Sequence, residues 1–239
     1  MIVGLKHQWI SNIDGLSIEN LHNIMSMFRF EWELVLVANY WPGMSDRTPA
    51  ICWELARRLS RVRVLAEPKQ GEMGWDLRKG LDACRGKYVG IIDGDGQFPV
   101  ETICSCFAKI TTDEYDFVKT YRILRADGFY RLVISKVYNG LFHLLFPDSR
   151  GLRDINSKPK IMTRVAYRRM ELCANDWFID AEIILNCLAL KLNVYEIPVQ
   201  FHALERRPSF VEPGAVFQFL KHLIEYRFGG RCKPPVWRG

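Results

Sequence analysis

The first half of the chain alternates short apolar runs with longer amphipathic segments. The runs at residues 33–39, 62–66, 88–92 and 116–120 have the length and composition of strands, and the segments at residues 50–59, 73–84 and 102–110 have the pattern of helices. Alternating strands and helices build a sheet of mostly parallel strands that is covered by helices. The sequence therefore predicts an α/β fold with such a sheet at its centre.

The second half continues with longer elements. A helix is expected at residues 128–146, a polar loop at 148–159, another helix at 179–190 and a strand at 194–199. No repeat, low-complexity tract or linker interrupts the chain. A chain of 239 residues, of which 49% are hydrophobic, can bury one sizeable core. We expect a single domain over residues 1–239.

The charge balance and the cysteines limit the partners and the compartment. A formal net charge of +6 favours an anionic partner, such as phosphate groups, nucleic acid or an acidic membrane, although a basic surface also serves solubility. Because no ladder of aromatic and basic residues accompanies the charge, nucleic acid is not expected. The 7 cysteines are odd in number and lack zinc-site spacing, which favours reduced thiols in the cytoplasm. Neither a signal peptide nor a transmembrane helix is expected.

Two carboxylates stand directly after the apolar run at residues 88–92. Asp93 and Asp95 are separated by one glycine, and open α/β sheets bind ligands at the carboxyl ends of their strands. Carboxylate oxygens suit Mg²⁺ or Mn²⁺, which share their coordination with substrate phosphates. The same residues also suit a plain turn, because Asp and Gly are favoured in turns. The pair alone favours neither interpretation.

Several further motifs surround this pair. They are residues 67–104, Tyr121-Arg122, residues 128–135, residues 153–160 and residues 177–182. In this order they resemble the family 2 glycosyltransferases, among them the dolichyl-phosphate mannose synthase and polyprenyl-phosphate glycosyltransferase type, over roughly residues 18–210. The resemblance implies a single-domain, nucleotide-sugar-binding, Rossmann-like fold of the A-type glycosyltransferases. It also implies a donor half at about residues 1–126, an acceptor half at 127–212, and a C-terminal helix with a basic tail at 213–239.

The resemblance gives the acidic pair and its neighbours a role. Asp93 and Asp95 would bind Mg²⁺ or Mn²⁺, Gln97 would complete the coordination, and Asp95 would also be catalytic. Gly71 would let the chain pass close to the nucleotide. A tight entry into the following helix explains this glycine as well.

A second group of residues would hold phosphate groups. The resemblance implies that Arg122, Arg131 and Ser135 contact donor and acceptor phosphates, to which the planar guanidinium fork is suited. Arg131 would also be catalytic, and its alternative is a surface arginine on an amphipathic helix. Arg206 and Arg207 would lie on a loop that closes over the acceptor phosphate, with two solvated surface arginines as the alternative.

The polar segment at residues 153–160 carries the remaining candidates. The resemblance implies a catalytic or sugar-positioning aspartate at Asp154, with Asn156, Ser157 and Lys160 as binding residues. An Asx-turn that caps a helix would explain the same residues without chemistry. Asp180 is a weaker candidate, because an acid at the start of a helix also interacts favourably with the helix dipole.

Two departures from the family pattern concern the nucleotide. The first strand is at best residues 2–5, and Asn39 stands where relatives carry an aspartate that reads the base. The nucleotide, of GDP or UDP type, is therefore left open. A truncated or weakly active protein is an alternative.

Two segments favour contact with a membrane. Tyr130, Ile134, Val137, Leu141 and Leu145 recur at helical spacing. The tail after residue 225 carries basic residues, one tryptophan and no acid, a composition that can lie on an anionic bilayer. A helix face packed in the core and an ordinary solvated tail are the alternatives.

These expectations define one predicted activity. The chain is expected to be an inverting, metal-dependent glycosyltransferase that moves a hexose of mannose or glucose type from a nucleotide-sugar to a polyprenyl or dolichyl phosphate, at the cytoplasmic (inner) face of a membrane. A phosphate is already ionised at pH 7, so its attack needs no strong general base. The alternatives are a glycosyltransferase with a soluble sugar or protein acceptor, and a nucleotide-sugar-binding protein without catalysis.

Overall fold

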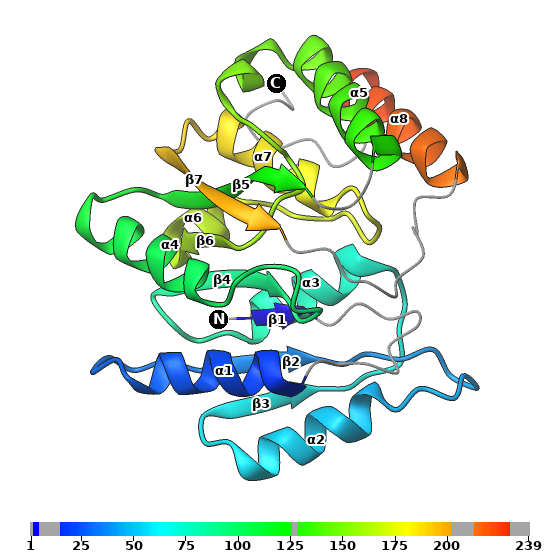
Figure 1. Cartoon of the computed structure of the whole chain (residues 1–239). Coiled ribbons are helices and arrows are strands. Elements are labelled where there is room, and N and C mark those ends of the chain that lie inside the picture. The colour runs from blue at the N-terminus through cyan, green and yellow to red at the C-terminus, as the bar shows by residue number, and fades with distance from the viewer. Residues whose placement is uncertain (1, 5–14, 126–128, 202–212, 230–239) are drawn as a thin grey trace.

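The computed structural model of the chain describes residues 2–4, 15–125, 129–201 and 213–229. Strands and helices alternate along it (Figure 1). The strands are β1 (Ile2–Gly4), β2 (Leu34–Val37), β3 (Val62–Leu65), β4 (Tyr88–Asp93), β5 (Phe117–Arg125), β6 (Lys160–Thr163) and β7 (Val194–Phe201). The helices are α1 (Gly15–Ser26), α2 (Thr48–Arg58), α3 (Met73–Ala83), α4 (Glu101–Thr112), α5 (Phe129–Leu145), α6 (Arg164–Arg169), α7 (Ile179–Ala189) and α8 (Pro213–Phe228), with a 3-10 helix at Pro147–Gly151.

The strands form one seven-stranded sheet in the order β3-β2-β1-β4-β6-β5-β7. All neighbouring strands are parallel except at β6, which runs antiparallel to both β4 and β5. The short β1 lies in the middle of the sheet, between β2 and β4. The predicted α/β fold with a mostly parallel sheet is therefore confirmed, and the atypical first strand takes a central place in it.

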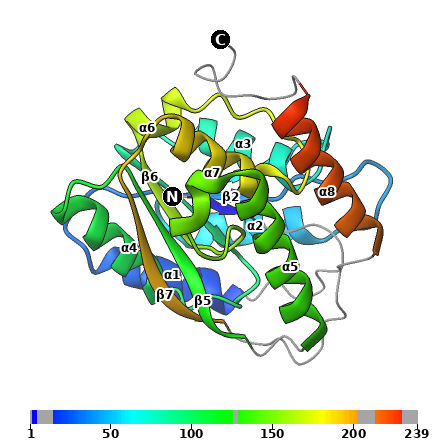
Figure 2. The ribbon, with the colours of Figure 1, turned by 90° about the horizontal axis from the view of Figure 1, so that it is seen from above.

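Helices cover both faces of the sheet (Figure 2). Side chains alternate between the faces along each strand, so that Leu34 and Leu36 pack with α1, α2 and α4 while Val35 and Val37 pack with α3 and α7. All four residues of β2 are buried. Burial on both faces is the reason that the strands read as continuous apolar runs rather than as an alternating pattern.

Three elements differ from the sequence expectations. α1 was not expected, although Ile18, Leu21 and Met25 are buried on one of its faces at helical spacing. β6 and α6 follow directly after the expected polar loop. β6 has only four residues and begins with a lysine, so its strand conformation depends on ladders to β4 and β5 that the local sequence does not encode.

Strand β5 and the edge strand β7 beside it are longer than expected. β5 continues to Arg125 and β7 to Phe201, because the two strands pair in parallel along this whole length. The cysteines also differ in part. Among the cysteines in the described ranges, five carry free thiols, but Cys173 is disulfide-bonded, so the expectation of reduced thiols is wrong at this position.

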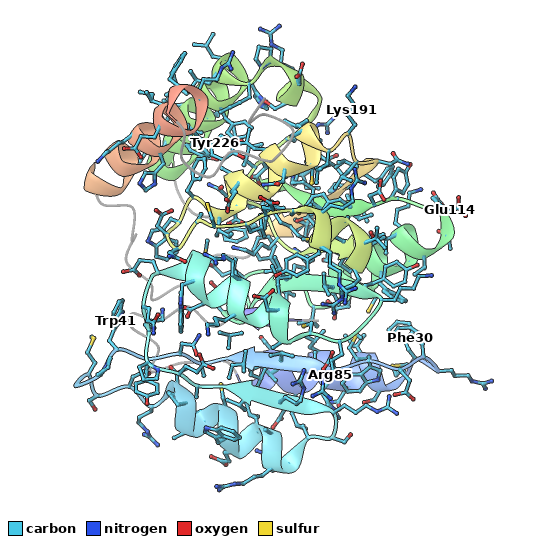
Figure 3. The ribbon with its side chains drawn as sticks, turned by 180° about the vertical axis from the view of Figure 1, so that it is seen from behind. Phe30, Trp41, Arg85, Glu114, Lys191 and Tyr226 are labelled. Carbon is cyan, nitrogen blue, oxygen red and sulfur yellow. The ribbon has the colours of Figure 1, made fainter. Side chains whose placement is uncertain are left out.

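The carboxyl ends of the parallel strands share one edge of the sheet. Figure 3 labels Phe30 and Glu114, which precede β2 and β5 at the amino edge, and Trp41, which follows β2 on the opposite side. The loops after β2, β3 and β4 therefore gather at the edge where open α/β sheets bind ligands.

Two glycines allow a loop to lie directly against the start of α3. A Cβ atom on Gly74 would lie 2.4 Å from the carbonyl oxygen of Ala174 and 2.6 Å from the carbonyl oxygen of Asp176. A Cβ atom on Gly71 would lie 3.1 Å from the carbonyl oxygen of Asn175. The backbone N–H of Glu72 also donates to the Asn175 carbonyl at 2.7 Å. The close approach at Gly71 is thus to this loop, and an approach to the nucleotide stays a prediction.

We predict that Gly74→Ala lowers the free energy of unfolding by at least about 1–3 kcal/mol, since backbone atoms cannot rotate away from the added methyl group. Gly140→Ala is the matched control, because this helical glycine of α5 has open space around its Cβ position and alanine there favours the helix by about 0.5–1 kcal/mol. Urea unfolding of both variants measures the difference. Equal stability of the two variants would show that the loop adapts without cost.

Candidate functional site

The carboxyl end of β4 carries the acidic pair. Asp93 is the last residue of β4, and its side chain is 11% exposed. Asp95 and Gln97 follow in a turn in which Gly96 has a φ of 72°, a left-handed conformation that favours glycine. The backbone N–H of Gln97 donates a 3.2 Å hydrogen bond to Oδ1 of Asp95. The residues therefore do form a turn, and this turn holds both carboxylates at the expected edge of the sheet.

The chemistry of this turn fits a hard cation. Two carboxylates and one amide offer oxygen ligands of the kind that Mg²⁺ and Mn²⁺ take, and both ions commonly complete their coordination with water and substrate phosphates. In the part of the chain that the structure describes, no three His, Cys, Asp or Glu side chains converge into a metal cage. A cation at Asp93 and Asp95 would therefore need Gln97, water or a donor phosphate as further ligands.

The polar segment before β6 is fastened to β5. The Thr120 hydroxyl lies 2.7 Å from the Ser157 hydroxyl and donates at 2.6 Å to the carbonyl oxygen of Lys158. Ser157 is fully buried, and its backbone N–H donates at 3.0 Å to the carbonyl of Asp154. Asp154 itself adopts a φ of 41°, so the segment turns sharply here. Ser157 thus has a structural role, and contact with a ligand stays a prediction.

Arg122 and Asp154 form a bidentate ion pair. Nε and Nη2 of Arg122 each lie 2.6 Å from one oxygen of the Asp154 carboxylate, and the backbone N–H of Arg122 donates to it at 3.1 Å. Burial alone would raise the pKa of Asp154, but the hydrogen bonds and charge of Arg122 outweigh it and lower the pKa. The structure therefore brings these two predicted residues together. In the state described here, each of them binds the other.

A second ion-pair cluster lies beside the first, and it consists of Lys158, Lys160, Asp93 and Asp180. Nζ of Lys158 lies 3.1 Å from Asp180 Oδ2 and 3.3 Å from Asp93 Oδ1, while Lys160 pairs with the other oxygen of Asp180. The side chains of Lys160, Lys158 and Asp180 are 0%, 2% and 3% exposed. Lys160, predicted as a ligand-binding residue, is thus enclosed and bonded to Asp180.

The cluster controls the ionisation of its members. Burial alone would raise the pKa of Asp180, but the charges of Lys158 and Lys160 outweigh it and lower this pKa to about 2. Burial lowers the pKa of Lys160 to about 8, while the two carboxylates together outweigh burial and raise the pKa of Lys158. Asp180 is therefore ionised, and it has both oxygens bonded to ammonium groups.

α5 is tied to the polar segment through Asn139. The Asn139 amide donates to the carbonyl and the hydroxyl of Ser135 at 2.7 and 3.3 Å, and its oxygen accepts from the backbone N–H of Ile155 at 3.1 Å. Asn156 is next in the chain, and its side-chain oxygen is buried without a hydrogen-bond partner. An unpaired buried acceptor costs about 1–3 kcal/mol, so this amide is the predicted binding residue that most clearly has capacity for a further donor.

Two predicted arginine sites cannot be placed in this way. Arg131 belongs to α5, but its side chain lies outside the described part of the structure. Arg206 and Arg207 lie outside the described residues altogether, as do the residues after 229. Their contacts with phosphate stay predictions.

The side chain of Asn39 forms hydrogen bonds within the protein. Its amide group donates to Asp76 Oδ1 at 2.9 Å, and its oxygen accepts from the backbone N–H of Glu67 at 2.8 Å. Nζ of Lys69 lies 2.6 Å from the other oxygen of Asp76, and both side chains are buried. An acid is thus present beside Asn39, but it comes from α3 rather than from the end of β2. Contact between Asn39 and the nucleotide stays a prediction.

Glu182 holds the loop that packs on α3. Its carboxylate is fully buried in α7 and accepts the backbone N–H groups of Cys173 and Ala174 at 2.9 and 3.0 Å. Burial raises the pKa of Glu182 to about 7, against the lowering effect of these hydrogen bonds and of Arg78. The sequence predicted no functional role for Glu182, which is one of two acids at the start of α7. The apolar residues around it in α7 could have indicated a buried acid.

Comparisons with known proteins show the family and the fold of the chain. Residues 17–172 match the family described as Glycosyl transferase family 2, and the chain belongs to that family. The fold is also that of glucosyl-3-phosphoglycerate synthase from Mycobacterium tuberculosis in complex with phosphoglyceric acid, which matches 94% of this chain and 78% of its own at a TM-score of 0.72 and 15% identity. The expected family and A-type glycosyltransferase fold are therefore confirmed.

Curated relatives are similar at lower coverage of their own length. A dolichyl-phosphate beta-glucosyltransferase of Trichomonas vaginalis is 27% identical over 74% of this chain and 56% of its own length. The glycosyltransferase AglD of Haloferax volcanii is 28% identical over 80% and 31%, and the dolichol-phosphate mannosyltransferase of Pyrococcus furiosus is 24% identical over 86% and 59%. The chain therefore spans between about a third and three fifths of the length of these relatives.

Glu182 generates a prediction about pH. The pKa is raised in the folded protein, so the folded state binds the proton more tightly than the unfolded chain does. The contribution of this proton to stability is complete below pH 4.5, and it is lost as the pH rises to about 7. The free energy of unfolding should therefore fall by about 3 kcal/mol between these pH values relative to Glu182→Gln, which cannot titrate. Parallel pH profiles of the two proteins in urea unfolding would contradict the assignment.

Proposed function

We propose that the protein is an inverting, metal-dependent glycosyltransferase that moves a hexose of mannose or glucose type from a nucleotide-sugar of GDP or UDP type to a polyprenyl or dolichyl phosphate. The observation that carries this proposal is the state of Asp154 and Asp180. A glycosyltransferase with a hydroxyl acceptor would need a carboxylate base near one of these two residues, and both are held in ion pairs with a lowered pKa.

A hydroxyl acceptor would need a base that takes up a proton near neutral pH. Asp180 has a pKa of about 2 and no oxygen that is not already bonded to an ammonium group, so it binds a proton weakly. The Asp154 carboxylate is held by the guanidinium group and the backbone N–H of Arg122. A phosphate acceptor carries its own negative charge and needs neither residue as a base. The acceptor class is therefore inferred from what the site does not supply.

The residues at the end of β4 would serve the donor. Asp93, Asp95 and Gln97 would hold Mg²⁺ or Mn²⁺, which neutralises charge on the departing nucleoside diphosphate when it is bound. Asn156 has an unpaired side-chain oxygen that could accept a hydrogen bond from a hydroxyl group of the sugar. An ionised acceptor needs to be aligned with the sugar rather than activated. We therefore assign Arg122 and Arg131 to binding the phosphate groups, and Asp154 to orienting the guanidinium group of Arg122.

The names of the relatives support a lipid phosphate, and one neighbour supports a rival. The Trichomonas vaginalis and Pyrococcus furiosus relatives are named for dolichyl or dolichol phosphate. The M. tuberculosis neighbour was solved with Mn²⁺, uridine diphosphate and glucosyl-3-phosphoglycerate, so a soluble phosphorylated acid is the second candidate acceptor. A lipid phosphate offers only its ionised phosphate as the attacking group, whereas phosphoglycerate also carries a neutral hydroxyl group, and the transfer experiment below separates the two acceptors.

We place the lipid-facing surface on α5 and α8, which lie side by side at one end of the molecule (Figures 1 and 2). The ring centroid of Phe146, directly after α5, lies 6.2 Å from that of Tyr226 in α8. The exposed apolar residues there are Val133, Val137, Leu144, Ile224 and Phe228, and the exposed cations are Lys136, Lys221 and Arg227. Apolar side chains with cations between them suit an anionic bilayer surface, such as the cytoplasmic face of a membrane.

This surface differs from the expected stripe. Of the residues predicted to face the lipid, Val137 is exposed, but Leu141 and Leu145 are only partly so and Leu145 packs against the core. The exposed face of α5 is instead the one that carries Val133, Val137 and Leu144. None of the helices in the described ranges is both long and apolar enough to cross a bilayer.

The transfer experiment uses a radiolabelled nucleotide-sugar panel with Mn²⁺. We expect labelled product with polyprenyl phosphate and none with 3-phosphoglycerate, and we expect Asp95→Asn to reduce transfer at least about 100-fold because the metal loses a charged ligand. Asp113→Asn on the exposed end of α4 is the control and should keep full activity. Transfer to 3-phosphoglycerate alone would favour the rival, and full turnover by Asp95→Asn would remove the metal assignment.

The membrane surface is tested by co-sedimentation with vesicles that contain anionic lipid. The double variant Leu144→Glu/Phe228→Glu should lose at least about tenfold in binding, since each change places a charge against the bilayer. Trp53→Glu is the control, because Trp53 is 49% exposed on α2, at the other end of the molecule (Figure 1). If the control loses as much binding as the double variant, the contact is not specific to α5 and α8.

A further inference from the structure

Lys158 occupies an unusual position in the site. Its side chain is 2% exposed, and Nζ lies 3.3 and 3.4 Å from the two oxygens of Asp93 and 3.8 Å from the sulfur of Met73. A buried ammonium group thus faces both oxygens of a carboxylate that we assign to the cation site. The function proposed above gives Lys158 no role.

The position of Lys158 is fixed by its backbone as well as by its charge. Its carbonyl oxygen accepts from the Thr120 hydroxyl at 2.6 Å, and the next carbonyl, of Pro159, accepts from the backbone N–H of Thr120 at 3.2 Å. Nζ is also held by Asp180 at 3.1 Å. The ammonium group is therefore anchored from β5 and from α7. If the ammonium group moved away, the buried carboxylate of Asp180 would keep only Lys160 as its partner.

The charges of the cluster balance without a metal. Lys158 and Lys160 contribute two positive charges, and Asp93 and Asp180 contribute two negative charges. A divalent cation on Asp93 adds positive charge next to Lys158, and like charges at short range in a partly buried site repel strongly. A nucleoside diphosphate brings compensating negative charge to the same place.

We propose that Lys158 is a positioning residue that orients the Asp93 carboxylate and weakens the binding of a free divalent cation, so that the cation binds tightly only together with the donor's diphosphate. This proposal deepens the function proposed above and rests on its metal site. Lys158 touches neither the donor nor the acceptor in this role. It acts through Asp93.

The test measures the binding of Mn²⁺ by electron paramagnetic resonance, with and without uridine diphosphate. Lys158→Met removes the ammonium group and keeps an unbranched side chain, and it should tighten the binding of Mn²⁺ alone by about tenfold or more. The enhancement of Mn²⁺ binding by uridine diphosphate should shrink in the variant by the same factor. If Lys158 only oriented the metal ligand Asp93, Lys158→Met would instead weaken Mn²⁺ binding, because loss of such a partner lowers metal affinity by about 10–100-fold.

Two further variants keep this test decisive. Lys158→Met/Asp180→Asn removes one charge of each sign from the cluster, and it should show the same tightening if the single variant does not fold. Lys119→Met is the matched control, because Lys119 is equally buried but pairs with Glu196 instead of Asp93, and its Mn²⁺ affinity should equal that of the unchanged protein.

The outcomes separate this proposal from the wider one. Unchanged or weaker Mn²⁺ binding in folded Lys158→Met overturns the proposal. An absence of Mn²⁺ binding in all variants overturns it together with the metal assignment. Normal Mn²⁺ behaviour without transfer to polyprenyl phosphate would overturn the proposed acceptor and leave the role of Lys158 standing.

Discussion

The buried ion pairs beneath the carboxyl edge of the sheet are the constraint on which the rest of the site depends. Lys158, Lys160 and Asp180 are almost completely enclosed, and removal of one partner from such a group costs about 3–5 kcal/mol, because the other charge stays buried. These ion pairs therefore fix the position of the polar segment before β6. That position also places Asp154 against Arg122 and Lys158 against Asp93.

The same pairing limits the chemistry that the site can perform. Carboxylates that are held by ammonium and guanidinium groups stay ionised, and they bind protons weakly. Such residues can orient other groups and balance charge. They do not take a proton from a neutral hydroxyl near pH 7. An acceptor that arrives ionised is compatible with this arrangement, and two of the relatives are named for dolichyl or dolichol phosphate.

The sequence predicted the fold better than the site, and the reason is the range of the interactions. Helices α2, α3 and α4 and strands β2 to β4 follow from periodicity within a few residues, so they were found to within about two residues. β6 was missed because its conformation comes from neighbours on both sides. The motifs indicated the candidate polar residues, but not their partners. Arg122 and Asp154 are 32 residues apart, and Lys158 and Asp93 are 65 apart.

The central claim is that neither Asp154 nor Asp180 acts as a base, and the pH dependence of transfer to polyprenyl phosphate tests it most directly. We expect kcat/KM to rise with the second ionisation of the acceptor phosphate, near pH 6, and then to stay level. Replacing the phosphate by a phosphonate, whose second ionisation occurs at higher pH, should move the rising limb by the difference between the two acceptors. A limb that stays at the same pH with both acceptors would belong to a base on the protein and would contradict the account.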